Sequence, residues 1–297
     1  MEPSDYGPFE YSPINRRAPW YWPNGARLAL WVVPNIEFFP LTRPLPGHPW
    51  EKASGNAADA PTVRAWGQRD YGNRVGIFRI MEVLEKMGIR ATATINSDVC
   101  DRHPQIVEDA VKLGWEFMGH NKTNSQRLTG LDREAERTVI RDALERIRQA
   151  TGKKPVGWLG SGLAETWNTL DLLADEGCLY VSDWVNDDQP YRMNVGNREL
   201  VYLPYSYEIN DSPQLYYRDR SIEEFELMIK HQFDVLYREA EHSARVMAIC
   251  LHPFVIGVPH RIGGLQRALE YICSHAGVWK ATGTEIVEAY LKTGVKL

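Results

Sequence analysis

The segment Ala-Arg-Leu-Ala-Leu-Trp-Val-Val-Pro, residues 26–34, decides the fold. It follows the turn-forming pair Asn24-Gly25 and is apolar at almost every position. A strand with one wet face alternates apolar and polar residues, whereas a continuous apolar run of this length is typical of a strand buried on both faces of a parallel sheet. The sequence therefore predicts a central parallel strand near the start of the chain.

Strand-like and helix-like segments alternate along the rest of the sequence. Apolar residues at 77, 80, 81, 84 and 87 have the spacing of one helix face, and Ser221 with Glu224 forms a capping-box signature. Further strands are expected at 89–95, 115–119, 155–159, 179–184, 200–205, 246–251 and 278–280. Helices are expected at 75–87, 104–113, 132–150, 165–176, 221–240 and 263–274, and from 284 onward.

This alternation predicts an α/β protein, and its economical form is a single irregular (β/α) barrel with about seven parallel strands. Residues 1–25 form an N-terminal arm, and 26–297 form the barrel domain. Residues 40–70 and 205–220 interrupt the alternation of strands and helices. An open doubly wound sheet is the alternative, but no glycine-rich phosphate fingerprint follows the first strand.

Composition and net charge limit the classes of partner that the protein can bind. The chain has 297 residues, a net charge of −5 and four cysteines without a C-x-x-C pair, so no electrostatic case exists for binding nucleic acid or an anionic membrane. No run approaches the ~18 apolar residues of a membrane span, and the first residues lack the order of a secretion signal. We expect a cytoplasmic protein that acts on a small molecule.

Titratable side chains recur where the predicted strands end. Glu37 follows the first strand, His120 the third and His252 the last long one. In a parallel barrel the loops at these ends converge on one mouth, where active sites lie. A carboxylate can take a proton from water and a histidine can protonate a leaving nitrogen, and amide hydrolysis needs both. The pattern favours a hydrolytic site built on these three residues.

Four segments in the same order carry a family resemblance. They are Asn35-Ile36-Glu37-Phe38, Tyr71-Gly72-Asn73-Arg74-Val75-Gly76, Ser182-Asp183 with Asp187-Asp188-Gln189-Pro190-Tyr191, and Leu251-His252-Pro253 with Arg261 beyond it. Together they resemble the polysaccharide-deacetylase superfamily (NodB-homology type), within it the subgroup of metal-independent allantoinases and cyclic-imide hydrolases. The resemblance spans about residues 22–287 and implies a polysaccharide-deacetylase-type barrel and a hydrolase of non-peptide C–N bonds.

The resemblance also implies roles. Glu37 matches the general base and His252 the general acid, and His120 becomes a hydrogen-bond donor to the carbonyl oxygen or to the attacking water. The residues assigned to substrate binding are Asn35, Phe38, Arg74, Asn124, Trp158, Asp183, Asp187 and Tyr191.

The departures from the superfamily pattern concern the metal. Deacetylases of this kind hold a divalent ion with an Asp and two His spaced four apart. Phe38 stands at the acid position and Asn124 stands four residues beyond His120, and neither suits zinc. The segment 157–160, Gly-Trp-Leu-Gly, also lacks the arginine that usually braces the catalytic acid, so the brace is missing or comes from elsewhere. We therefore expect no metal cofactor.

Three hypotheses follow. The first is metal-independent ring opening of a small cyclic amide, imide or ureide, whose carbonyl is more reactive than that of an ordinary amide. The second is a metal-dependent N-deacetylase of a sugar or other N-acyl compound, with zinc held by Glu37, His120 and His252. The third is a degraded member that only binds a small ligand. The subgroup forms dimers or tetramers, and the aromatic arm is compatible with a homo-oligomer.

Overall fold

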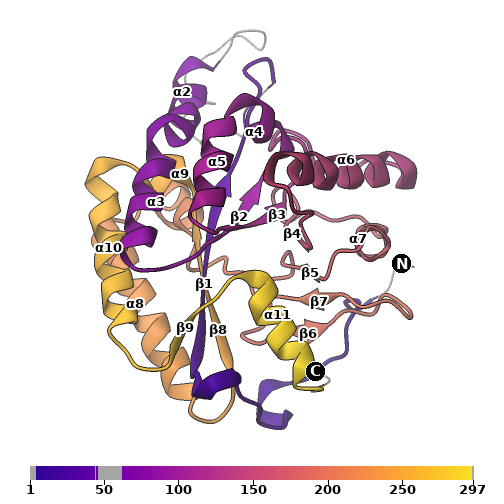
Figure 1. Cartoon of the computed structure of the whole chain (residues 1–297), viewed down its shortest axis with the longest axis vertical. Helices are drawn as coiled ribbons and strands as arrows, with labels where there is room; N and C mark the ends of the chain where they lie inside the picture. Colours follow the sequence, from indigo (N-terminus) through magenta and orange to yellow (C-terminus); the bar gives the residue numbers. More distant parts are fainter. Residues whose placement is uncertain (1–4, 44, 46–61, 296–297) are drawn as a thin grey trace.

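The described part of the chain comprises residues 5–43, 45 and 62–295 of the computed structural model. Its strands are β1 (Leu28–Ile36), β2 (Thr92–Ile95), β3 (Glu116–Gly119), β4 (Gly157–Trp158), β5 (Tyr180–Val181), β6 (Tyr191–Arg192), β7 (Val201–Tyr202), β8 (Arg245–Leu251) and β9 (Val278–Lys280). They form one curled sheet in the order β6-β7-β5-β4-β3-β2-β1-β8, with β9 also paired to β1 (Figure 1). All paired strands are parallel except β6 and β7. The prediction of an α/β, mainly parallel, barrel-type fold is confirmed.

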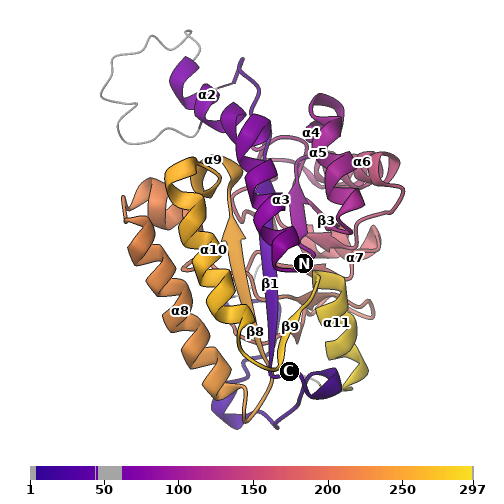
Figure 2. The same cartoon turned by 60° about the vertical axis from the view of Figure 1, so that its left-hand side comes forward.

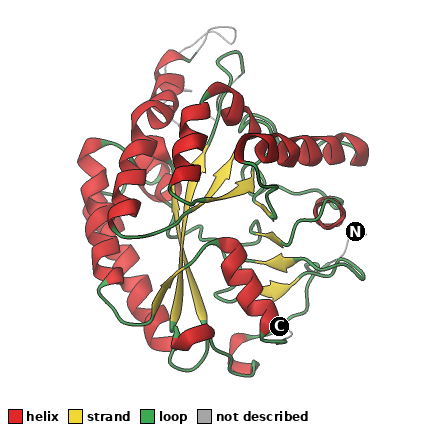
Figure 3. Cartoon of the chain, viewed as in Figure 1, coloured by secondary structure: helices red, strands yellow, loops and turns green. Residues whose placement is uncertain are grey.

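Helices flank the strands on the outer side of the curled sheet (Figure 2), and the strands gather in the interior (Figure 3). The α-helices of the described residues are α2 (Val63–Tyr71), α3 (Ile77–Lys86), α4 (Ser97–Arg102), α5 (Pro104–Lys112), α6 (Arg133–Thr151), α7 (Thr169–Asp175), α8 (Ile222–Glu239), α9 (Pro253–Ile256), α10 (Pro259–Cys273) and α11 (Gly283–Lys292). None of the helices in the described residues is long and apolar enough to cross a membrane.

Strand β1 separates the two halves of the core. Every residue of it is buried, as the apolar run predicts. Because side chains alternate along a strand, Leu30 and Val32 pack with the core beneath the outer helices, whereas Trp31 and Val33 pack in the barrel interior. The same alternation turns Glu37, one residue past the strand, toward the interior at the carboxyl ends of the strands.

Several elements differ from the expectation. The helix expected from residue 75 begins earlier, because α2 runs through a π-helical turn, η3 (Gly72–Gly76), directly into α3. The residues of α2 are mostly polar and show no apolar period, so the helical pattern is absent there. Strand β6 is antiparallel and pairs through two residues only. Part of the predicted 40–70 insertion, residues 46–61, lies outside the described residues.

The sheet has two edge strands, β6 and β8, and other segments bridge the interval between them. The Val246 amide donates to the Asp188 carbonyl (2.9 Å), and the Cys250 amide donates to the Ile209 carbonyl (3.0 Å). The arm lies across the start of β8, where the Trp22 indole donates to the Arg245 carbonyl (2.9 Å). Backbone groups of the β8 edge are thus paired, which keeps that edge from being exposed.

Candidate active site

Three of the predicted residues meet at the carboxyl ends of the strands. Glu37 Oε1 lies 3.7 Å from His120 Nε2 and 3.7 Å from His252 Nε2. The carboxylate follows β1, and the two imidazoles follow β3 and β8. All three side chains are largely buried, with exposed fractions of 3% for His120, 10% for Glu37 and 11% for His252.

His252 is held by a buried carboxylate that the sequence did not point to. Its Nδ1 donates to Asp211 Oδ1 at 2.8 Å, and its backbone amide donates to the same carboxylate at 2.7 and 2.9 Å. Burial lowers the pKa of His252, but the negative charges of Asp211 and Glu37 outweigh it and hold that pKa above its usual value. The Nε2 atom therefore carries its proton toward Glu37 over a wide pH range.

His120 has a fixed tautomer. Its Nδ1 lies 2.6 Å from the Leu159 carbonyl oxygen, which can only accept, so Nδ1 carries the hydrogen. The Nε2 atom is buried and has no hydrogen-bond partner within the protein. This atom faces Glu37 Oε1.

Asn124 connects Glu37 to its neighbours. Its amide nitrogen Nδ2 donates to Glu37 Oε1 at 2.7 Å. Since an ionised carboxylate only accepts, this orientation of the amide follows from its partner. The Asn124 backbone amide donates to the Phe38 carbonyl (2.9 Å), and the Phe38 amide donates to Asn96 Oδ1 (2.9 Å). The loops after β1, β2 and β3 are thereby locked together.

The charges around Glu37 keep it ionised. Burial raises the pKa of Glu37, but the interaction with His120 and the positive charges of His252 and Arg69 outweigh it, so that this pKa lies below its usual value. Arg69 comes from α2 and is 5% exposed. Its guanidinium carbon lies 4.9 Å from the Phe39 ring centroid and 5.3 Å from that of Phe254. An arginine whose charge acts on Glu37 is thus supplied by α2 and not by β4.

The donor set does not fit the superfamily's divalent metal. The Phe38 position offers no ligand, and the Asn124 N–H group points at Glu37, on the side where a cation would need a lone pair. Within the described residues, no group of three or more His, Cys, Asp or Glu side chains could hold a metal ion.

Asp183 acts on His120 through one peptide unit. The Gly160 amide donates to Asp183 Oδ1 at 2.8 Å, and the carbonyl of the same peptide, that of Leu159, accepts from His120. Hydrogen bonds in such a chain polarise one another. Burial raises the pKa of Asp183 to about 6, and burial with the charge of Asp183 raises the pKa of the neighbouring Glu165 well above its usual value.

The other predicted pocket residues are placed apart from Glu37. Asn35 lies beneath it, with Nδ2 donating to the Leu251 carbonyl (3.1 Å). Trp158 is fully buried against α6 and α7 on the outer face of β4, because the side chain points away from the interior at that position. Arg74 is 73% exposed and lies 3.6 Å from Asp70 on the same helix surface.

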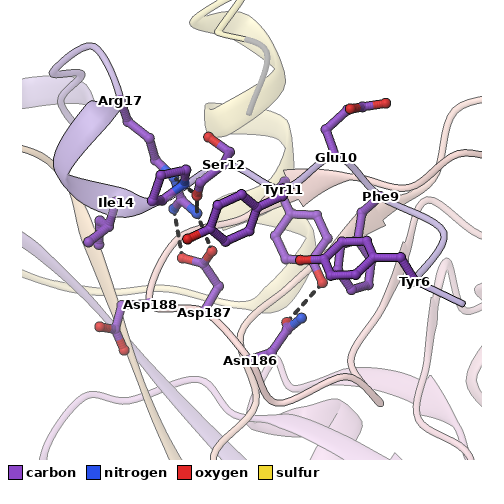
Figure 4. A pocket seen from close by; sticks show the side chains of 12 residues that line it. Tyr6, Phe9, Glu10, Tyr11, Ser12, Ile14, Arg17, Asn186, Asp187 and Asp188 are labelled. Carbon is purple, nitrogen blue, oxygen red and sulfur yellow. Dashed lines mark hydrogen bonds and ion pairs between the residues drawn. The ribbon is translucent and has the colours of Figure 1, made fainter.

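Asp187 and Tyr191 line a different cavity, formed with residues of the N-terminal arm, and Figure 4 shows Asp187 there beside Arg17. This cavity has a volume of about 390 Å³. Asp187 pairs there with Arg17, and the Tyr191 hydroxyl donates to Asn186 Oδ1 at 2.9 Å. The backbone of the adjacent Asp188 bonds to the start of β8, whereas His252 follows its end. A strand of this length spans about 20 Å, so the structure does not bring these two residues to the proposed base and acid.

The Tyr-Gly-x-Arg-x-Gly stretch has a structural explanation. Its turn η3 packs on α9, directly after His252. A Cβ added to Gly72 would lie 2.6 Å from the Phe254 nitrogen, and one added to Gly76 would lie 2.1 Å from the Pro253 oxygen. The two glycines therefore allow two backbones to touch, and this contact fixes the segment that follows the histidine.

Asp211 and Arg69 are the residues near Glu37 that the sequence did not single out. Asp211 precedes a π-helical stretch, η4 (Ser212–Tyr217), within the 205–220 interruption, where no periodic pattern places it beside β8. Arg69 lies in the polar helix α2. Only the tertiary fold brings these two charges to Glu37 and His252.

Comparisons with known proteins show which families the chain is similar to. The family described as polysaccharide deacetylase matches residues 69–181. A protein of Schizosaccharomyces pombe named "Putative polysaccharide deacetylase" is 29% identical over 74% of this chain and 74% of its own length. A peptidoglycan deacetylase of Helicobacter pylori is 24% identical over 75% of this chain and 86% of its own.

Among solved structures, that of PuuE allantoinase superposes with a TM-score of 0.81 at 28% identity, covering 92% of this chain and 93% of the other. Both types of relative that the motifs suggested, deacetylase and allantoinase, are thus present among the similar proteins. Residues 69–181 thus match the polysaccharide-deacetylase family, and the chain as a whole is similar to proteins named as deacetylases and to an allantoinase, which are hydrolases of C–N bonds.

Proposed function

We propose that this protein opens the ring of a small cyclic amide, imide or ureide by hydrolysis, with no metal ion, using Glu37 as general base and His252 as general acid. One observation carries the proposal. An ionised carboxylate lies at 3.7 Å from two imidazole nitrogens, and one of these imidazoles is supported by a buried carboxylate. A base and an acid of opposite protonation state thus face the same small region.

In the reaction, Glu37 takes a proton from the water that attacks the ring carbonyl. His120 contacts the same water through Nε2, because Nδ1 is committed to the Leu159 carbonyl. His252 then gives its Nε2 proton to the leaving ring nitrogen as the C–N bond breaks. Asn124 keeps one Glu37 oxygen occupied, which leaves the other free for the water.

Metal independence is supported by the donor set around Glu37. A metal would polarise the carbonyl and lower the pKa of water, so that an enzyme without one needs a more reactive bond. Cyclic imides and ureides provide it, because their carbonyls receive less donation from nitrogen and their nitrogen leaves more readily. The likeness to PuuE allantoinase supports the same substrate class.

The test is hydrolysis by chelator-treated protein of a panel of hydantoins and cyclic imides beside N-acetylated sugars. We expect ring opening that survives chelation. The Glu37→Gln variant should keep the circular dichroism spectrum and lose about 100-fold or more in kcat. Full activity of Glu37→Gln would contradict the assignment of the base, and ligand-induced thermal stabilisation without any product would support a non-catalytic binding protein instead.

The names of the curated relatives favour a second candidate, an N-deacetylase of a glycan or other N-acyl substrate. The same panel separates the two. Release of acetate from N-acetylated sugars, returning only when zinc is added after chelation, would establish the deacetylase and exclude metal-independent ring opening.

A further inference from the structure

A cation without a partner lies beside the catalytic loops. Arg127 belongs to the loop after β3, three residues beyond Asn124. Its Nη1 atom is buried and has no hydrogen-bond partner within the protein, and its guanidinium forms no ion pair in the part of the chain that the structure describes. A buried N–H group without an acceptor costs about 1–3 kcal/mol, and more when it is charged. A side chain held in this way is ready for an anionic partner.

The backbone holds the guanidinium in place. A Cβ added to Gly162, in the loop after β4, would lie 2.0 Å from Arg127 Nη1 and 2.4 Å from its Cζ. Gly162 has a φ of +75°, a conformation that favours glycine, and a side chain at this position would displace the end of Arg127. The loop of Arg127 is fixed as well, because the Asn121 side chain donates to the Gln126 carbonyl (2.8 Å).

These two loops border the proposed catalytic residues. The Ser161 hydroxyl, next to Gly162, donates to the His120 carbonyl at 3.1 Å. Tyr217 lies within electrostatic range of both sides: burial raises its pKa, Glu37 adds to the rise, and the charges of Arg69 and Arg127 oppose it. Arg127 thus shares the mouth of the barrel with Glu37.

Other buried polar atoms without a partner within the protein gather at the same strand ends. They are Thr94 Oγ1, His120 Nε2, Asn124 Oδ1, Ser125 Oγ and Ser182 Oγ. Buried polar groups are nearly always satisfied, so this cluster indicates that a polar ligand belongs here.

We propose that Arg127 binds an acidic group of the substrate, so that the preferred ring amide carries a carboxylate away from the bond that is cleaved. This inference rests on the proposed ring-opening function and names its substrate class. A guanidinium with free N–H groups pairs with a carboxylate through two parallel hydrogen bonds. Arg69 is the arginine among the main influences on the pKa of Glu37, which leaves Arg127 available for a substrate group away from the reacting carbonyl.

The experiment compares two substrates that differ by one acidic group, hydantoin and hydantoin-5-acetic acid. We expect the wild-type protein to prefer the acid. In Arg127→Gln the ratio of the two kcat/KM values should fall about 10- to 100-fold, mainly through KM for the acid, as expected for losing one charged hydrogen-bonded contact. Arg127→Lys, which keeps the charge but not the planar fork, should lose less. Arg141→Gln is the matched control, because Arg141 is 55% exposed on α6, and it should leave the ratio unchanged.

An unchanged ratio in both Arg127→Gln and Arg127→Lys would overturn the proposal. A binding measurement separates this failure from a failure of the proposed function. Calorimetric titration of the Glu37→Gln protein and of Glu37→Gln/Arg127→Gln with hydantoin-5-acetic acid reports recognition without turnover. Weaker binding by the double variant supports the role of Arg127 even if no ring is opened, and equal binding by both proteins refutes it.

Discussion

At the scale of single residues, Asp211 decides over which pH range His252 can act as an acid. The two side chains are buried together and joined at 2.8 Å, and the negative charge of Asp211 is the main influence that raises the pKa of His252 against its burial. The proposed mechanism requires an ionised Glu37 and a protonated His252. The acid limb of the kcat profile should therefore lie below the usual range of a glutamate, and the alkaline limb above that of a histidine.

Replacing Asp211 with Asn should move only the alkaline limb. Without the carboxylate, burial dominates and lowers the pKa of His252, so its proton is lost at a lower pH. The measurement is kcat against pH for the wild type and for Asp211→Asn. The acid limb, set by Glu37, stays in place as an internal control, and an alkaline limb that does not move would show that Asp211 has no influence on the acid.

The sequence predicts the members of this site unevenly, for a physical reason. Glu37, His120 and His252 each follow a strand whose apolar pattern is clear, and parallel strands bring their carboxyl ends together. Asp211 and Arg69 lie on π-helical or polar segments without such a pattern, so that only tertiary contacts bring them near. Trp158 shows the limit of this reasoning. It also ends a strand, but successive side chains of a strand point to opposite faces, and that of Trp158 points to the outer face.

At the scale of elements, Asp183 in the loop after β5 bonds to the loop after β4, and its ionisation should make the free energy of unfolding depend on pH. Burial raises the pKa of Asp183 to about 6, above the 3.9 of an unfolded chain, so the folded state binds this proton more tightly. The contribution of this Asp183 proton to the free energy of unfolding is therefore fully present below pH 3.9 and is lost as pH rises through about 6. A shift of two pKa units corresponds to about 3 kcal/mol.

The asparagine in Asp183→Asn has no proton to lose in this pH range. The free energy of unfolding of the variant, relative to that of the wild type, should therefore rise by up to about 3 kcal/mol between pH 4 and pH 7. Urea denaturation of both proteins at several pH values measures the difference, in which carboxylates other than the neighbouring Glu165 cancel. Parallel stability curves for the two proteins would mean that Asp183 titrates at an ordinary pKa in the folded state.

The contact between η3 and α9 makes a second prediction about elements. In Gly76→Ala the new Cβ would lie 2.1 Å from the Pro253 oxygen, so the two backbones must separate. Overpacking of this kind costs about 1–3 kcal/mol, and kcat should also fall because Pro253 is bonded to His252. Gly67→Ala in α2 makes the same chemical change where nothing lies within 4 Å, and should stabilise by about 0.5–1 kcal/mol. Equal stability of the two variants would contradict the packing role.

At the scale of the whole molecule, the N-terminal arm joins parts of the barrel that the sheet leaves apart. Arg17 forms a two-pronged ion pair with Asp187 and donates to Gln189 Oε1 at 3.1 Å. Gln189 in turn donates to the Ala244 carbonyl at 2.7 Å, just before β8. The predicted division at residue 25 separates the arm in sequence, but its contacts run across the interval between β6 and β8.

The arm should therefore contribute to stability and not to chemistry. The Arg17 and Asp187 side chains are 7% and 11% exposed, and removing one partner of a buried pair costs about 3–5 kcal/mol. In a double-mutant cycle with Arg17→Ala and Asp187→Ala, urea denaturation should give a coupling energy of about 1–3 kcal/mol. The exposed pair Arg148 and Glu145 serves as the reference, and its coupling energy should be clearly smaller because solvent screens it. The value of kcat should stay near that of the wild type, since Asp187 lies about a strand length from His252. A coupling no larger than that of the exposed pair would mean that the arm rests on the barrel without closing it.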